Sequence, residues 1–274
     1  MKSNFIIFTD LDGTLLDHHT YSFKGAKEAL GRIREANIPL ILCSSKTRAE
    51  MELWRKRLKN RDPFISENGG AVFFPEPVDN AGIDFYKKDN YQVIELGIPY
   101  HKLMDRYQKL KDIFKDKIRG FSEMETREVV KLTGLPREEA SRAKRREYTE
   151  PFIFDGREDE VEKLRKEIKD LDLNVTRGGR FFHLMGDNDK GKAVNITSEI
   201  YQKNHRNLKT IALGDSLNDL SMLKTADIPF LVKKPDGKHD ERVSFVKLRH
   251  TSGVGPFGWN EAIESILKEG SMAK

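Results

Sequence analysis

Two aspartates stand one residue apart directly after an apolar run near the start of the chain. The stretch is NFIIFTDLDGTLLD, in which Asp10 and Asp12 follow the apolar residues Phe5–Thr9. Two carboxylates this close repel each other unless solvent screens them or a cation lies between them. An aspartate after a strand is also a common turn or helix-cap residue, so the pair alone has two interpretations.

Three further polar residues follow apolar runs or open helices in the same way. Ser44 follows IPLILC, Asp215 follows TIALG, and Lys190 begins an expected helix. Carboxylates without histidine or cysteine among them favour Mg²⁺ over Zn²⁺. A carboxylate can attack phosphorus, and a second one can serve as general acid and base. A lysine and a hydroxyl stabilise the charge of a phosphoryl group. The set predicts phosphoryl transfer through a covalent aspartyl phosphate.

These residues meet only if the chain folds as a parallel sheet. Continuous apolar runs at Phe5–Thr9 and Ile38–Cys43 are typical of strands buried on both faces. Sequences with helical spacing of apolar residues follow each run, up to the glycine turn SENGG at Ser66–Gly70. The alternation predicts an α/β fold with a doubly wound, Rossmann-like parallel sheet. Ligands of such sheets bind beyond the carboxyl ends of the strands.

The pattern changes in the middle of the chain. Short strands, including VIELG at Val93–Gly97, mix there with amphipathic helices over about a hundred residues, which predicts an inserted α+β domain. The α/β rhythm then returns, with expected strands at Ile228–Lys233 and Arg242–Leu248. We therefore expect a core domain formed by 1–82 and 188–274, interrupted by a cap domain at 83–187.

The motifs also carry a family resemblance. DLDGT, a hydroxyl residue after the second strand, a lysine that opens a late helix, and GDSLND resemble the haloacid dehalogenase superfamily of phosphatases, in the order that the superfamily uses. The resemblance implies that Asp10 is the nucleophile and Asp12 the acid and base, that Ser44 and Lys190 bind the phosphate, and that a large α/β cap is inserted. It further implies a Mg²⁺ site made by Asp10, the Asp12 carbonyl, Asp215 and Asp219.

One departure points to the substrate. Many relatives with such a cap carry Thr-Gly-Arg after the second strand, whereas this chain has SSKT. With REYTEPFIF and RGGRFFHLMGDNDKGKAV, this piece resembles superfamily members that act on a phosphorylated sugar acid, a small molecule. The implied substrate-binding residues are Ser45, Lys46, Thr149, Arg177, Gly178, Gly179, Arg180 and Asn218. RGG is also consistent with a tight turn, and Arg180 is also consistent with a surface charge. His183 is consistent with a position that faces the substrate or with one in the core.

Composition limits the other classes of function. The chain has 274 residues, 37% of them hydrophobic and 34% charged, and a net charge of +5. Its densest basic run, SRAKRREY, has no accompanying nucleic-acid motif, so we expect an anionic small-molecule site or a solvated helix face. Cys43 is the only cysteine, and no run approaches the ~18 apolar residues of a membrane span. We expect a cytoplasmic protein that binds neither nucleic acid nor membrane; no pattern predicts an oligomeric state.

Alternatives remain at this point. GDNDKGKA nearly matches a phosphate-binding loop, but Ala193 stands where the Mg²⁺-binding hydroxyl belongs. Another sugar phosphatase or a phosphomutase of the same superfamily would share the core motifs and differ in the cap. A non-catalytic binding protein with the same fold is the alternative from another class.

Overall fold

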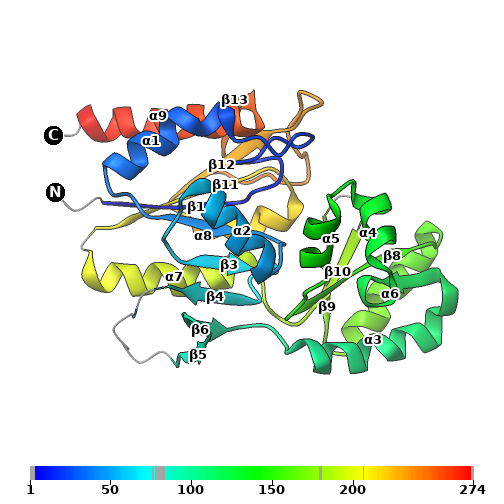
Figure 1. Ribbon diagram of the computed structural model, residues 1–274. Helices are drawn as coiled ribbons and strands as arrows, with labels where there is room; N and C mark the ends of the chain where they lie inside the picture. Colours follow the sequence, from blue (N-terminus) through cyan, green and yellow to red (C-terminus); the bar gives the residue numbers. More distant parts are fainter. Residues whose placement is uncertain (1–3, 76, 78–83, 179–180, 206, 273–274) are drawn as a thin grey trace.

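The structure, a computed structural model, describes residues 4–75, 77, 84–178, 181–205 and 207–272. Within these ranges a sheet of nine strands has the order β13-β12-β11-β1-β2-β3-β4-β6-β5 (Figure 1). The pairs from β13 to β3 are parallel, and those from β3 to β5 are antiparallel. The strands are β1 (Phe5–Thr9), β2 (Leu40–Cys43), β3 (Phe64–Ser66), β4 (Ala71–Phe74), β5 (Tyr86–Lys88), β6 (Tyr91–Glu95), β11 (Lys209–Gly214), β12 (Ile228–Lys233) and β13 (Arg249–Val254).

Helices cover both faces of this sheet, which explains why its strands are continuous apolar runs. Alternate residues of β1 enter two separate apolar clusters: Ile7 lies in one, and Ile6 and Phe8 lie in the other. The first cluster includes side chains from α1 (Lys27–Glu35), α2 (Arg48–Leu58) and α9 (Gly255–Met272), and the second includes side chains from α7 (Lys190–Asn204) and α8 (Leu220–Thr225). Figure 1 shows α1 and α9 on one side of the sheet and α7 on the other.

A second sheet forms the cap, which lies beside the carboxyl edge of the core sheet (Figure 1). In the described part of the chain it has four antiparallel strands, in the order β7 (Ile118–Gly120), β8 (Thr149–Phe154), β10 (Phe181–Met185), β9 (Asn174–Gly178). One face packs with α3 (Tyr100–Phe114) and α6 (Glu158–Asp170), and the other with α4 (Thr126–Thr133) and α5 (Arg137–Ala143).

The predicted α/β core with an inserted cap is confirmed, with two corrections. VIELG was assigned to the cap, but β6 pairs with β4 and extends the core sheet. We therefore propose that the cap begins after β6 rather than at residue 83, which lies outside the described residues. The boundary between 187 and 188 stays a prediction.

The expected strand Arg242–Leu248 is wrong. Turns close at both of its ends, where the Val243 amide donates to the Asp240 carbonyl and the Leu248 amide to the Phe245 carbonyl. Val243 is buried while Val246 is fully exposed, and the parallel edge strand β13 forms directly afterwards.

Among the described helices, none combines the length and apolar character needed to cross a membrane.

Candidate active site

The carboxyl ends of three adjacent parallel strands bring the predicted residues together. β11, β1 and β2 are neighbours in the sheet, and Asp215, Asp10 and Ser44 follow them directly. Lys190 is the first residue of α7, whose N-cap Asp189 accepts a hydrogen bond from the Lys192 amide. The local sequence thus places a helix start, and with it Lys190, at the edge where the three strands end.

Lys190 lies between two carboxylates. Its Nζ is 2.7 Å from Oδ1 of Asp10 and 2.6 Å from Oδ1 of Asp219, and its side chain has an exposed fraction of 0%. Burial alone would lower the pKa of Lys190, but the charges of Asp10 and Asp219 outweigh it and hold the pKa above its usual value. The amine therefore stays a cation inside the site.

Three carboxylates converge beside this amine. Asp10, Asp215 and Asp219 are buried, and each offers an oxygen within 4.8 Å of the others. Burial, opposed by Lys190 and aided by the neighbouring acids, raises the pKa of Asp10 well above its usual range. Burial and the charge of Asp219 raise the pKa of Asp215 to about 7. The single positive charge of Lys190 therefore does not balance the three carboxylates. Because the donor atoms of these carboxylates are all oxygens, the cluster fits Mg²⁺.

Gly13 makes room for this cluster. It adopts a φ of +80°, and a Cβ at this position would lie 2.9 Å from Oδ2 of Asp215. The glycine of DLDGT is therefore required both by the backbone turn and by the close approach of the carboxylate.

Asp219 has its oxygens engaged with protein donors. Oδ2 accepts from the backbone amides of Asp215 at 3.0 Å and Ser216 at 3.1 Å, while Oδ1 accepts from Lys190. Asn218 accepts a hydrogen bond from the Ser216 hydroxyl through its Oδ1. Asp219 thus orients Lys190 and the turn, which leaves Asp10 and Asp215 as the freer donors for a metal. The metal role of Asp219 and the substrate role of Asn218 stay predictions.

Asp12 is paired with Lys46. Nζ of Lys46 lies 2.8 Å from Oδ2 of Asp12, and the Asp12 side chain is 40% exposed. Burial would lower the pKa of Lys46, but Asp12 and Glu50 raise it above its usual value. In the structure the ammonium group of Lys46 thus holds Asp12, the predicted acid and base, and the expected substrate role of Lys46 stays a prediction.

Ser44 and Ser45 lie in a loop with a fixed backbone. The Ser44 amide donates to Ile65 O at 3.1 Å, and the Ser44 carbonyl accepts from the amide of Asn68 at 3.0 Å. The carbonyl of Ser45 accepts a hydrogen bond of 2.8 Å from Nη1 of Arg146, a residue of the cap. These contacts fix the backbone of Ser44 at the end of β2, the neighbour of β1, which Asp10 follows.

The structure separates the predicted cap residues. Thr149 Oγ1 donates to Glu67 at 2.8 Å, at the junction with the core. Arg177 lies opposite Phe182, and its guanidinium lies 5.0 Å from the centre of that ring. Directly opposite residues share a face of a sheet, so Arg177 lies on the α3 and α6 side, and its substrate role stays a prediction. Gly178 ends β9, and Gly179 and Arg180 lie outside the described residues.

Two residues at the junction of cap and core were not predicted. Glu67 is buried, and its carboxylate accepts hydrogen bonds from the amides of Glu147, Tyr148 and Thr149 at 2.8, 3.0 and 2.8 Å. Arg146 bridges to the core through Ser45. Glu67 belongs to SENGG, which the sequence analysis treats only as a turn. Arg146 belongs to SRAKRREY, which it treats as a basic run. The pairing of segments so distant in sequence could not be inferred from either.

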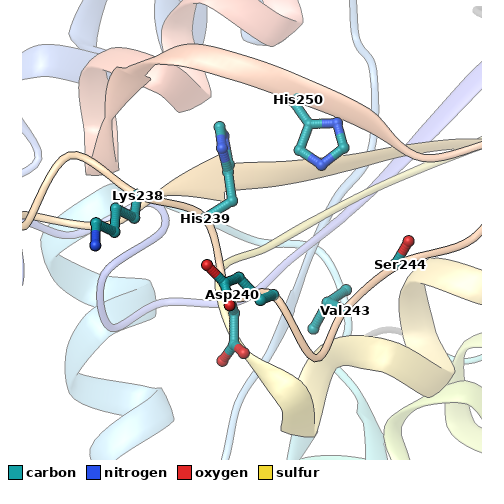
Figure 2. A pocket seen from close by; sticks show the side chains of 7 residues that line it. Lys238, His239, Asp240, Val243, Ser244 and His250 are labelled. Atoms are coloured by element: carbon teal, nitrogen blue, oxygen red, sulfur yellow. The ribbon is translucent and has the colours of Figure 1, made fainter.

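An open pocket of about 460 Å³ lies near the start of β13, and its lining includes His239, Asp240 and His250 (Figure 2). Two of its polar groups, His239 and Asp240, already have partners within the chain. His239 Nε2 is 3.0 Å from the Thr251 carbonyl, and Asp240 pairs with Lys234 and Arg242. We assign it no chemistry.

Comparisons with known proteins identify the family of the chain. Residues 7–252 match the family of haloacid dehalogenase-like hydrolases. A protein of Methanococcoides burtonii named glucosyl-3-phosphoglycerate/mannosyl-3-phosphoglycerate phosphatase is 48% identical over 265 residues, which are 96% of this chain and 97% of that protein. The mannosyl-3-phosphoglycerate phosphatase of Pyrococcus horikoshii is 37% identical over 241 residues, covering 88% of this chain and 96% of that protein.

Solved structures share the fold at lower identity. A Thermoplasma acidophilum protein has a TM-score of 0.67 at 18% identity and covers 96% of each chain. The sucrose-phosphatase of Synechocystis, solved with sucrose and phosphate, has a TM-score of 0.64 at 11% identity, with 96% of this chain and 97% of that chain covered. At these identities the likeness concerns the fold alone.

Proposed function

The chain belongs to the family of haloacid dehalogenase-like hydrolases and is a phosphoric monoester hydrolase, and we propose that it hydrolyses mannosyl-3-phosphoglycerate to mannosylglycerate and inorganic phosphate. The observation that carries the chemistry is the buried Lys190 held between Asp10 and Asp219 beside Asp215. The substrate is supported by the relatives at 48% and 37% identity, both of which are named as phosphatases of mannosyl-3-phosphoglycerate. Mannosylglycerate is a compatible solute.

In the first half of the proposed reaction, a carboxylate oxygen of Asp10 attacks phosphorus. The bond from phosphorus to the glyceryl oxygen breaks, and that oxygen takes a proton from Asp12. Lys190, a permanent cation, stabilises charge on Asp10 and on the transferring group. The electron pair of the broken bond leaves with the mannosylglycerate oxygen, and the phosphoryl group stays on Asp10 as an acyl phosphate.

In the second half, Asp12 accepts a proton from water as that water attacks phosphorus. Inorganic phosphate leaves, and the Asp10 carboxylate is restored. Lys46 positions Asp12 for both proton transfers, since its ammonium group holds one carboxylate oxygen. Ser44 donates a hydrogen bond to the phosphoryl group from the end of β2.

We propose Mg²⁺ as cofactor, held by the carboxylates of Asp10 and Asp215 with the Asp12 carbonyl. When bound, the ion draws charge from the phosphoryl oxygens and offsets the repulsion among the acids. A cytoplasmic location is part of the same proposal, because the only cysteine, Cys43, is buried as a free thiol.

A panel of phosphate esters tests the substrate. With Mg²⁺ present, we expect phosphate release from mannosyl-3-phosphoglycerate at least about tenfold faster than from sucrose phosphate or trehalose phosphate, since poorly matched hydroxyls leave polar groups of the site unpaired. The glucosyl analogue belongs in the panel, because two relatives are named for both substrates. Faster release from sucrose phosphate would overturn the substrate assignment, and isomerisation without phosphate release would indicate a phosphomutase.

A further inference from the structure

His183 occupies the central part of the cap sheet, on the face that meets the core. It lies on β10, between Pro151 of β8 and Thr176 of β9. Its neighbours Phe182 and Leu184 enter the apolar cluster with α3 and α6, so His183 projects from the opposite face. Thr149, paired with Met185 on that same face, donates to Glu67 of the core. The imidazole is therefore directed to the junction with the core.

The Nδ1 atom of the His183 side chain is buried, and no contact among the described residues satisfies it. The residue is 7% exposed, and in the part of the chain that the structure describes its Nδ1 has no hydrogen-bond partner. A buried polar atom left unpaired costs about 1–3 kcal/mol. Burial and the charges of Arg146 and Lys190 lower the pKa of His183 to about 3, so the ring is neutral and can both donate and accept.

Asn68 presents a similar group from the core. Its side chain is 3% exposed, and neither amide atom has a hydrogen-bond partner among the described residues. Its backbone amide donates to the Ser44 carbonyl, and its carbonyl accepts from Asn188 Nδ2 at 3.3 Å. Asn68 therefore lies between Ser44 and the loop that leads from β10 to Lys190.

We propose that His183 from the cap and Asn68 from the core bind hydroxyl groups of the organic part of the phosphate ester and determine the specificity of the enzyme. The inference rests on the proposed function and deepens it. Both side chains are uncharged and carry donor and acceptor atoms, which suits hydroxyls of a sugar or glyceryl group. The charge of Arg146 acts on His183, and Arg146 is fixed at the same junction by its hydrogen bond to the Ser45 carbonyl. The ligand class is thus a polyhydroxylated alcohol esterified to phosphate.

Sites built to hydrogen-bond a hydroxyl discriminate strongly, because an ester without that hydroxyl leaves the protein groups unpaired. If an ester does not contact the His183 and Asn68 side chains, its kcat/KM should not change when those side chains are removed. Comparison of a sugar ester with p-nitrophenyl phosphate, which has a phosphate but no hydroxyls on its alcohol, therefore isolates the contribution of His183 and Asn68 from the chemistry at Asp10.

The experiment measures kcat/KM on mannosyl-3-phosphoglycerate and on p-nitrophenyl phosphate for the wild type, His183→Leu, His183→Gln and Asn68→Gly. Glycine is chosen because Asn68 has a φ of +55°. We expect His183→Leu to lose at least about tenfold on the sugar ester, the equivalent of one lost hydrogen bond, and less than about twofold on p-nitrophenyl phosphate. His183→Gln should retain part of the preference. His101→Leu, at an exposed histidine, is the matched control.

Equal losses on both esters, or no loss on the sugar ester, would overturn the proposal. If His183→Leu does not fold, Asn68→Gly carries the same comparison, with the same expected and contradicting results. If the wild type prefers a different phosphate ester, the proposed substrate is wrong. The comparison then uses that preferred ester, so that failure of the substrate assignment and failure of the His183 and Asn68 assignment are distinguished.

Discussion

Nζ of Lys190 lies 2.7 Å from Oδ1 of Asp10, with the lysine side chain fully buried. Asp219, at 2.6 Å, holds the same amine from the other side. A buried cation with two carboxylate partners is both a structural and a chemical element, because its removal leaves the acids uncompensated. We therefore expect a substitution of Lys190 to lower both the catalytic rate and the stability of the fold.

Lys190→Met should lower kcat by about a hundred- to a thousandfold, since the charge beside the transferring phosphoryl group is lost. It should also lower the free energy of unfolding by about 3–5 kcal/mol, measured by denaturant titration without divalent cations. Lys192→Met is the control, because Lys192 is exposed and pairs with Asp187. A variant with wild-type kcat would contradict the assignment of Lys190 to the reacting centre.

Lys46→Met separates two roles of Lys46. If the lysine positions Asp12, as the 2.8 Å contact indicates, kcat should fall about tenfold, a fraction of a general acid's contribution, with little change in KM. If Lys46 binds substrate, KM should rise instead. Steady-state kinetics with mannosyl-3-phosphoglycerate decide, and the exposed Lys56→Met serves as control.

Glu67→Gln should weaken the junction between cap and core. The carboxylate accepts hydrogen bonds from three backbone amides and from the Thr149 hydroxyl. The NH₂ group of a glutamine side chain would place a hydrogen-bond donor against these donors. We expect a loss of about 1–3 kcal/mol in the free energy of unfolding, measured by urea titration. The exposed Glu35→Gln should show no such loss, and equal stability of Glu67→Gln and wild type would contradict the contact.

The stability contributed at His183 should depend on pH. Burial, then the charges of Arg146 and Lys190, lower its folded pKa to about 3 from 6.5. Below pH 6.5 the unfolded chain binds a proton that the folded chain does not, so stability falls as pH falls towards 3. Relative to His183→Leu, the wild type should lose up to about 1.4 kcal/mol per pH unit between pH 6 and 4. Parallel stability curves for the two proteins would refute this.

Mg²⁺ should stabilise the protein through the buried acids. At a hundredfold excess over its Kd, a bound ion adds about 2.7 kcal/mol, which corresponds to a rise in Tm of roughly 5 °C or more for a chain of this size. Chelation should reverse the rise and stop phosphate release. Asp215→Asn should remove most of the rise; an undiminished shift in that variant would place the ion elsewhere.

The sequence predicted which polar residues gather at the carboxyl edge of the core sheet, because the signal for each of them is local. Asp10, Ser44 and Asp215 each end a short apolar run, and parallel pairing then brings them together without further information. Lys190 follows the capping residue Asp189, which marks the helix start.

The parts that sequence analysis missed depend on pairing across the chain. β6 has the same alternation in either sheet, and only its ladder with β4 places it in the core. The face on which Arg177 lies depends on the register of β9 against β10, which a slip of one residue would reverse. The same holds for Glu67, whose partners lie about eighty residues away.

The most direct test of the account is a trap of the phosphorylated enzyme. Wild-type protein is mixed with mannosyl-3-phosphoglycerate carrying radioactive phosphorus and Mg²⁺, quenched in acid within one turnover, and digested for peptide mapping. The account predicts label on the peptide that contains Asp10, lost on treatment with hydroxylamine, and neither label nor phosphate release with Asp10→Asn. Phosphate release by Asp10→Asn at the wild-type rate, or label on a different peptide, would contradict it.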